Sequence, residues 1–167
     1  MNEDGPVIAI DSREQKPYAF PVSKVVALRT ADYSIVGMEH LVAIERKTLA
    51  DAYASLGRGR ARFEAEVERM AALDYGAIVI EASLPEFLQG PLFSQMNPKA
   101  AINSLLAWAV RFGIGVFFAG DRRYGNAITQ TLLEKYWTYN RNGRAVGVER
   151  RDDCTDLRHP CPRGEQR

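Results

Sequence analysis

Cysteine is nearly absent from this sequence. The two cysteines, Cys154 and Cys161, both lie near its C-terminal end, so the core of the fold cannot depend on a disulfide framework. His159 lies between them and makes a possible metal triplet. Zinc sites normally need four ligands at closer spacing, and two free thiols in a basic tail are the simpler interpretation.

Long apolar runs and an excess of charge of one sign are also missing. No apolar run is long enough to cross a bilayer, and the polar, acidic start of the chain, residues 1–6, does not resemble a secretion signal. We therefore expect no membrane partner and, by default, a reducing cytoplasm. The net charge is +1, which gives no argument for a nucleic-acid partner. Such an argument has to come from local charge.

What the sequence does contain is the patterning of one α/β domain. Hydrophobic residues make up 46% of its 167 residues and charged residues 26%, an ordinary globular mixture with enough chain for a core. Strands are expected at residues 7–10, 24–29, 32–36 and 41–47, with a turn at 37–40. Two helices are expected next, at 49–56 with Thr48 as N-cap, and at 60–73.

The second half of the sequence alternates strands and helices. We expect a strand at 76–82, an irregular segment at 85–97 with room for one helical turn, a helix at 98–112, a buried strand at 114–119 and a last helix at 121–139. This order predicts an α/β fold with a central mixed β-sheet, partly parallel, flanked by helices on both faces. Residues 1–140 are expected to form this domain, and residues 141–167 a flexible basic tail.

The most informative cluster is Glu45-Arg46-Lys47, on the last of the early strands. Glu45 and Lys47 are two residues apart, so their side chains project from one face of the strand, whereas Arg46 projects from the other. Asp32 is a second acid nearby. A carboxylate beside an ammonium group, with another carboxylate close by, indicates a metal-and-water site for cutting phosphodiester bonds.

Four short signatures occur in a fixed order: Asp11-Ser12-Arg13-Glu14, Asp32-Tyr33, Glu45-Arg46-Lys47 and Asp51. Together they resemble the nuclease domain of the XPF family, which includes the archaeal Hef nuclease and belongs to the restriction-endonuclease-like superfamily with PD-(D/E)xK sites. The resemblance runs from about Val7 to Tyr136 and implies a restriction-endonuclease-like fold. The chain departs from the family at Ala31, where relatives have glycine, and the segment after residue 140 is too short for their tandem helix-hairpin-helix module.

This resemblance implies roles for the acids and the lysine. Asp32 and Glu45 are expected to hold a magnesium or manganese ion, with Asp11 as a further metal ligand. Lys47 is expected to orient the attacking water and to stabilise the charge that develops on the phosphate. The residues alone also allow a different interpretation, because strand acids are often simply solvated, an edge lysine can block aggregation, and Asp11 suits a turn.

Arg46, Asp51 and Glu14 complete the expected catalytic set. A buried Arg46 needs a carboxylate partner, for which Glu14 and Asp51 are the candidates, unless Arg46 reaches the phosphate itself. Asp51 also occupies the third helical position after Thr48, as in a capping box. It could therefore cap the helix, act in catalysis, or do both.

Arginines are the expected DNA contacts. Arg13 in the first signature could bind phosphate or pair with an acid of the site. Arg58, Arg60 and Arg62, in a glycine-containing segment, suit contact with a phosphate backbone. The alternative is that these three pair with glutamates of the next helix, namely Glu64, Glu66 and Glu68.

The sequence thus predicts a Mg²⁺-dependent DNA endonuclease. By resemblance it leaves 5′-phosphate and 3′-hydroxyl ends, acts on branched, flap or fork DNA in repair or recombination, and pairs as a homodimer or heterodimer through this domain. The stand-alone form of the domain suggests a bacterial or phage setting, so the expected cytoplasm is that of a bacterium or of a phage-infected host cell. Two alternatives stay open: a non-catalytic DNA-junction-binding or dimerisation subunit of the same family, and a sequence-specific restriction-type nuclease. The intact acids argue against the first, and the missing recognition insert argues against the second.

Overall fold

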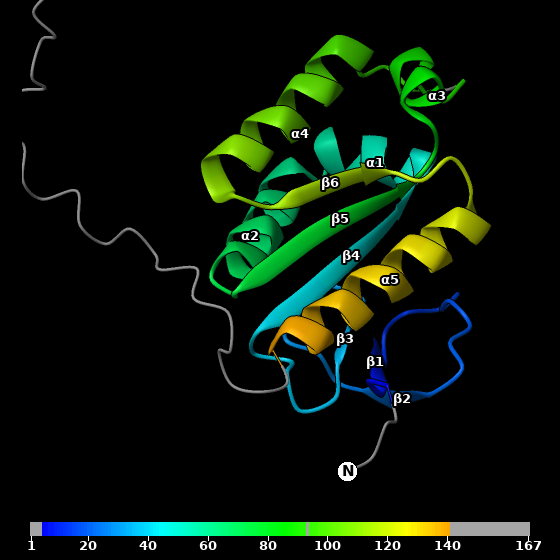
Figure 1. Cartoon of the computed structure of the whole chain (residues 1–167). Helices are drawn as coiled ribbons and strands as arrows, with labels where there is room; N and C mark the ends of the chain where they lie inside the picture. The colour runs from blue at the N-terminus through cyan, green and yellow to red at the C-terminus, as the bar shows by residue number, and fades with distance from the viewer. Residues whose placement is uncertain (1–4, 93, 141–167) are drawn as a thin grey trace, which may run out of the picture.

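Short apolar segments form most strands of a six-stranded sheet with helices on both sides (Figure 1). The computed structural model describes residues 5–92 and 94–140. The predicted tail at 141–167, with Cys154, His159 and Cys161, lies outside the described residues. In chain order the elements are β1 (Ile8–Asp11), β2 (Ser23–Val26), β3 (Tyr33–Ile35), β4 (Val42–Thr48), α1 (Leu49–Leu56), α2 (Arg60–Ala71), β5 (Tyr75–Glu81), α3 (Leu84–Gln89), α4 (Pro98–Phe112), β6 (Gly115–Phe118) and α5 (Arg122–Asn140).

The strand order of the sheet is β2-β1-β3-β4-β5-β6. β3 is antiparallel to both β1 and β4, whereas β4, β5 and β6 run parallel to one another. The predicted mixed sheet is therefore confirmed. β2 lies parallel to β1 at one edge, and the parallel pairing requires the long connection at residues 12–22, called here the β1–β2 loop. β6 forms the other edge and is half-buried, not fully buried as expected, because an edge strand has a neighbour on one side only.

Helices cover both faces of the sheet, α1 to α4 on one face and α5 on the other (Figure 1). Each layer has its own apolar core. Trp108 on α4 is 2% exposed and packs edge-on against Phe63. On the α5 side, Leu133 and Tyr136 belong to a second cluster, in which α5 packs against β3, β4 and β5. None of the helices within residues 5–92 and 94–140 is long and apolar enough to span a bilayer.

Local chemistry sets the helix ends. The Thr48 hydroxyl accepts from the N–H of Asp51 at the start of α1, and Asn97 and Pro98 begin α4 where predicted. α3 falls partly in the segment expected to be irregular. Its signal was present in the sequence, because Ser83 and Glu86 form a capping box.

Candidate active site

A cleft of about 860 Å³ opens where the sheet meets α1 and α2. All the predicted site residues line it except Arg58 and Arg60. The predicted residues in its wall are Asp11, Arg13, Glu14, Asp32, Glu45, Arg46, Lys47, Asp51 and Arg62. The four signatures, which are separate in the sequence, therefore converge on one surface.

Main-chain pairing between neighbouring strands brings the acids together. The N–H of Asp11 donates to the carbonyl of Asp32 at 2.8 Å, and the N–H of Asp32 donates to the carbonyl of Ile44 at 3.2 Å. Asp32 comes directly before β3, and its Oδ2 accepts from the N–H of Arg46 at 2.8 Å. A main-chain donor on β4 thus fixes the Asp32 carboxylate near Glu45.

Glu45 and Lys47 share one face of β4, as their spacing predicted. Their side chains form an ion pair between Oε1 and Nζ, and Nζ lies 4.7 Å from the ring centre of Phe63. Glu45 is 3% exposed, and its second oxygen, Oε2, is buried with no hydrogen-bond partner in the described part of the chain. A buried carboxylate oxygen without a donor is costly, so this atom is a strong candidate to bind a cation or a water.

The surroundings of the two acids favour their neutral forms. Burial raises the pKa of Asp32 above its usual 3.8, and the charge of Glu14 adds to this, while the N–H of Arg46 opposes it. Burial and then the charge of Asp32 raise the pKa of Glu45 above its usual 4.5, while Lys47 opposes this. Burial works against the charge of Lys47, but Glu45, together with the charges of Glu66 and Asp32, outweighs burial and leaves the pKa of Lys47 raised. The buried Glu45 and the half-buried Asp32 therefore both depend on the charge of one ammonium group, and a cation would stabilise their charged forms.

The two acids suit a hard divalent cation held at an open site. Mg²⁺ usually takes only one or two protein carboxylates and keeps waters or substrate oxygens as its other ligands. Within residues 5–92 and 94–140, no three His, Cys, Asp or Glu side chains are grouped as a ready-made metal site. Asp32 and Glu45, with its partnerless Oε2, match the two-carboxylate arrangement and not a closed structural one.

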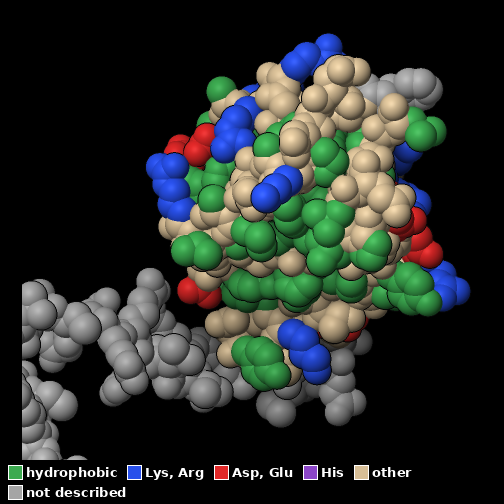
Figure 2. Space-filling view, turned by 90° about the horizontal axis from the view of Figure 1, so that it is seen from above, with side chains coloured by type: hydrophobic (Ala, Val, Ile, Leu, Met, Phe, Trp, Pro, Cys, Tyr) green, Lys and Arg blue, Asp and Glu red, His purple; other side chains and the backbone are tan. Residues whose placement is uncertain are grey.

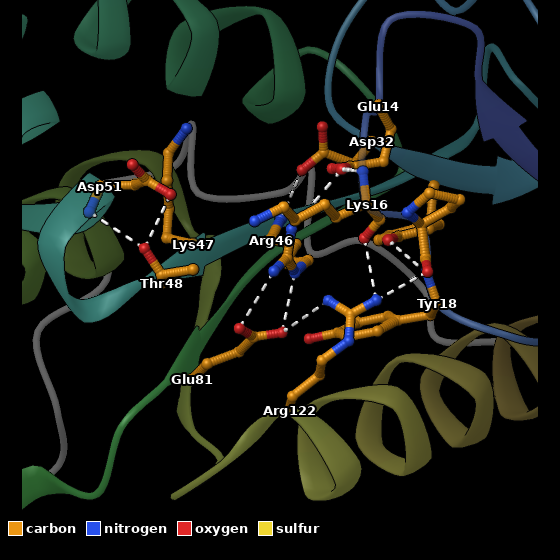
Figure 3. A network of polar contacts seen from close by, with 12 residues as sticks. Glu14, Lys16, Tyr18, Asp32, Arg46, Lys47, Thr48, Asp51, Glu81 and Arg122 are labelled. Carbon is orange, nitrogen blue, oxygen red and sulfur yellow. Dashed lines mark hydrogen bonds and ion pairs between the residues drawn. The ribbon is translucent and has the colours of Figure 1, made fainter.

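Arg46 projects from the opposite face of β4, as predicted, and its main partner is Glu81 at the end of β5 (Figure 3). Its Nε and Nη2 donate to Glu81 at 2.7 and 3.1 Å, and its Nη1 lies 3.5 Å from Glu14. Glu14 is therefore a second, longer partner. Asp51 was the wrong candidate, because it bonds to Thr48 on the other side of the strand (Figure 3). The sequence reasoning missed Glu81 entirely.

Asp11 is buried and fully occupied by local donors. Its Oδ1 accepts from the N–H and Nε of Arg13 at 2.7 and 2.9 Å, and its Oδ2 accepts from Arg13 Nη2 at 2.7 Å and from the N–H of Leu28 at 3.2 Å. The bond from Arg13 lowers the pKa of Asp11, although burial opposes it. This geometry corresponds to the turn interpretation of Asp11, and its role as a metal ligand stays a prediction.

Asp51 has the geometry of a helix cap. Its N–H donates to the Thr48 hydroxyl at 3.2 Å, and that hydroxyl donates to Asp51 Oδ2 at 2.7 Å. Asp51 also lines the cleft, so capping aims its carboxylate at the site. The catalytic role remains a prediction.

The arginines around α2 point in different directions. Arg62 lines the cleft, but Arg60 lies 5.1 Å over the ring of Trp108 and donates to Ser104 on α4 at 2.7 Å. Arg58 borders a separate groove of about 610 Å³ beside α1. The three predicted DNA contacts therefore do not form one patch. Arg60 and Arg62 are two residues apart on α2 and so turned by about 200° from each other, and Arg58 lies in the turn before α2.

α2 adds two cleft residues that were not predicted, Glu66 and Arg69. They follow Arg62 at the i+4 and i+7 positions and so share its helix face, a spacing that could have identified them. Glu66 Oε1 accepts from the N–H of Ala31 at 3.4 Å. Glu64 turns away and pairs with Arg111 on α4 at 3.2 Å.

Ala31 occupies the position where the resemblance implies glycine, and its backbone conformation suits a glycine. Its φ is 61°, in the left-handed region, and among the described residues no other non-glycine residue has a positive φ. The turn at Ala31 directs the chain into Asp32 and β3. The departure from glycine keeps the turn and adds backbone strain.

Comparison with protein families gives a match over most of the described region. Residues 10–132 match the family model of the ERCC4 domain. The chain belongs to the ERCC4 domain family. The resemblance carried by the four signatures is thereby confirmed, and it places the chain in a family of DNA nucleases.

Solved structures agree with the ERCC4 assignment. XPF from Aeropyrum pernix matches with a TM-score of 0.63 and 18% identity, covering 82% of this chain and 69% of that chain. XPF from Aeropyrum pernix in complex with DNA matches with a TM-score of 0.63 and 22% identity, covering 86% and 68%. The predicted restriction-endonuclease-like α/β fold is therefore confirmed. Comparison with curated protein sequences gives no match.

Proposed function

We propose that this ERCC4-domain chain is a divalent-metal-dependent DNA endonuclease that hydrolyses phosphodiester bonds in branched, flap or fork DNA, in repair or recombination. The observation that carries the proposal is the pair of acids, the half-buried Asp32 and the buried Glu45, beside Lys47 in an open cleft. Family membership supports a nuclease, and one structural relative, XPF from Aeropyrum pernix, has been solved in complex with DNA.

Each residue of this group has a distinct task in the proposal. Asp32 and Glu45 would hold Mg²⁺ or Mn²⁺, Glu45 through Oε2. When bound, the metal polarises the scissile phosphate and lowers the pKa of a bound water. Lys47, on the same strand face as Glu45, orients the attacking water and stabilises the negative charge that develops on the phosphate. Asp11 becomes a further ligand only if Arg13 releases it.

The rim of the cleft offers cations for the DNA backbone. Arg62 and Arg69 on α2, and Arg13 and Lys16 in the β1–β2 loop, line the same cleft as the acids. Arginine and lysine contacts to phosphate position a duplex without reading its sequence. This arrangement supports a nuclease that recognises the DNA backbone and shape.

Cleavage of defined DNA forms tests the proposal. Labelled linear duplex, single-stranded, flap, fork and four-way-junction DNA are incubated with Mg²⁺, Mn²⁺ or EDTA. We expect branched forms to be cut, EDTA to abolish cutting, and Glu45→Gln and Lys47→Ala each to lower the rate about 100-fold or more. Glu64→Gln is the matched control, because Glu64 lies on α2 but pairs with Arg111 away from the cleft.

Three results would contradict the proposal in different ways. Binding of branched DNA without cutting under any metal condition supports the non-catalytic subunit. Cutting at one recognition sequence in linear duplex supports a restriction-type enzyme. Undiminished cutting by both cleft variants shows that the reaction occurs elsewhere.

We also propose that two copies of the chain pair through the face that carries α3 and α4. Figure 2 shows hydrophobic side chains gathered over this face. The exposed large apolar residues of these helices are Leu84, Leu88, Leu106 and Val110, the last 88% exposed. Contiguous apolar surface of this kind is typical of a protein interface.

Light scattering after gel filtration tests the homodimer. We expect the wild-type chain to elute at twice the monomer mass and Val110→Glu to shift it toward the monomer. Val22→Glu is the control, because Val22 is also exposed but lies beside β2, at the far edge of the sheet. A monomeric wild type at micromolar concentration would contradict the homodimer and leave a related subunit as the partner.

A further inference from the structure

The β1–β2 loop, which carries Glu14 into the cleft, is held from the opposite end of the chain by α5. Arg122 Nη2 donates to the carbonyls of Lys16 and Pro17 at 2.9 and 2.7 Å, and Asn126 Nδ2 donates to the carbonyl of Ala19 at 2.9 Å. Both donors lie in the first two turns of α5. Without these donors, the loop carbonyls would depend on solvent for hydrogen bonds. They are bonded instead by α5, which lies on the face of the sheet opposite α1 and α2.

Tyr18 fixes the middle of the loop beneath α5. Its ring stacks on Tyr33 with the ring centres 5.2 Å apart, and the guanidinium carbons of Arg122 and Arg46 lie 5.0 and 5.5 Å from its ring centre. Its N–H donates to the Tyr33 hydroxyl at 3.0 Å. Gly125 leaves room for this packing, since a Cβ there would lie 2.3 Å from Tyr18 Oη.

Glu81 connects this loop anchor to the cleft (Figure 3). Its carboxylate accepts from Arg46 at 2.7 and 3.1 Å, and Arg122 Nη1 lies 3.5 Å from its Oε1. Arg46 in turn lies 3.5 Å from Glu14 and gives its N–H to Asp32. Charges of alternating sign therefore run from α5 through Glu81 and Arg46 to Glu14.

We propose that Glu81 and Arg122 are positioning residues that hold Arg46 and the β1–β2 loop, so that Glu14 keeps its place in the cleft. Neither residue is part of the cleft wall, so both act through the groups they touch. The side chains of Glu81 and Arg46 are 8% and 10% exposed. Without Glu81, the buried guanidinium of Arg46 would have Glu14 as its remaining acidic partner. Arg46 and Glu14 would then shift together from their positions.

A general structural role is the alternative to positioning. A structural ion pair would change the stability of the whole fold, whereas positioning residues would loosen one loop and slow one reaction step. The predicted loosening of the β1–β2 loop can be measured whether or not the chain has nuclease activity. The effect on reaction rate rests on the proposed nuclease function, so the experiment measures the two separately.

Hydrogen exchange and cleavage are measured on the full chain for the wild type, Glu81→Gln and Arg122→Gln. Arg123→Gln is the matched control: it removes the same charge one residue further along α5, where Arg123 bonds to its neighbour Tyr124. Exchange is followed by mass spectrometry on peptides covering residues 12–20, with thermal unfolding recorded alongside. Cleavage of flap DNA with Mg²⁺ gives kcat and KM.

We expect both test variants to raise exchange in residues 12–20 about tenfold or more, while peptides from β5 and α4 exchange as in the wild type. We expect kcat to fall about 10- to 100-fold, with KM changed less than about twofold. This range is typical of residues that orient the groups of a site through hydrogen bonds. Glu81→Asp should recover part of the rate, and Arg123→Gln should match the wild type.

Three outcomes would overturn the proposal. Unchanged exchange in residues 12–20 shows that the loop does not depend on these residues. Faster exchange throughout the fold shows a general structural role. Local loosening with an unchanged kcat shows that loop order does not matter for the reaction. If the wild type cuts no DNA, the nuclease proposal fails, but the exchange data still decide whether Glu81 and Arg122 hold the loop.

Discussion

The backbone conformation of Ala31 determines where the neighbouring site residue, Asp32, lies. The φ of 61° at Ala31 turns the chain so that Asp32 enters the cleft, and Ala31 is 3% exposed. A non-glycine residue in this conformation costs about 1–2 kcal/mol. The turn therefore persists because the pairing of Asp32 with its neighbouring strands holds it in place.

We expect Ala31→Gly to leave the free energy of unfolding within about 1 kcal/mol of the wild type. Relief of strain, about 1–2 kcal/mol, is offset by the loss of a buried methyl group, about 0.8 kcal/mol, and by the greater freedom of glycine in the unfolded chain. Ala31→Val should cost about 2 kcal/mol or more, because a β-branched residue strongly disfavours positive φ. Urea unfolding measures both, and equal stability of the two variants would contradict the assigned conformation.

Single residues also show what the sequence could and could not foretell. The shared face of Glu45 and Lys47 followed from a period of two, and the Thr48 cap from its position before α1. The partner of Arg46 could not be predicted, because Glu81 is 35 residues away and only the pairing of β4 with β5 brings it near. Nothing local in a sequence signals such a contact.

At the scale of elements, α5 acts as the support of the β1–β2 loop, and Gly125 is the point of closest approach. Glycine within a helix normally weakens it by about 1 kcal/mol relative to alanine. Here a methyl group has no room beside the Tyr18 hydroxyl. Packing between two elements therefore outweighs helix propensity at this position.

We expect Gly125→Ala to destabilise the fold by about 1–3 kcal/mol in spite of its better helix propensity, because it overpacks the contact with Tyr18. Tyr18→Phe removes the atom that lies 2.3 Å from the new Cβ, so the double variant should recover part of the loss. Thermal or urea unfolding of the four members of this cycle measures the coupling. A stabilising Gly125→Ala would show that α5 and the loop are not in close contact.

Some helices and strand pairings were predicted from the sequence, and others were not. The helix at α4 was predicted at its observed limits, since Asn97, Pro98 and Gly113 mark its ends. The parallel pairing of β2 with β1 was not foreseen, because its connection carries no helix to signal a crossover. Arg58, Arg60 and Arg62 were treated as one patch, although helical geometry separates them.

For the whole molecule, the two acids of the cleft, Asp32 and Glu45, tie folding stability to pH and to divalent cations. The raised pKa values of Asp32 and Glu45 mean that the folded state keeps protons that the unfolded state has released above the usual values of 3.8 and 4.5. Stability without metal therefore falls as pH rises from these values through the raised ones. Lys47 keeps its charge throughout this window, because its pKa is also raised.

We expect the melting temperature in EDTA to fall between about pH 5 and pH 8, and Mg²⁺ to raise it more at pH 8 than at pH 5, where protons compete with the cation. Glu45→Gln should flatten the pH dependence and weaken the Mg²⁺ effect. Differential scanning calorimetry at three pH values measures this. A melting temperature in EDTA that rises with pH would contradict the raised pKa values.

Strand β4 carries the Glu45 and Lys47 pair on one face and Arg46 on the other. This arrangement favours a single pairing register of the strand. A shift of its pairing by one residue would reverse the faces, placing the guanidinium among the residues under α1 and α2 and the acid among those under α5. Arg46 would then lose Glu81, whereas Glu45 and Lys47 would stay paired with each other but leave the cleft. The seven residue pairs that β4 makes with β5 hold the correct alignment, so misaligned chains would lose both core packing and the charge compensation of Arg46 at once. The charged side chains of β4 are costly to bury, yet they thus help to select the strand register in which the site forms.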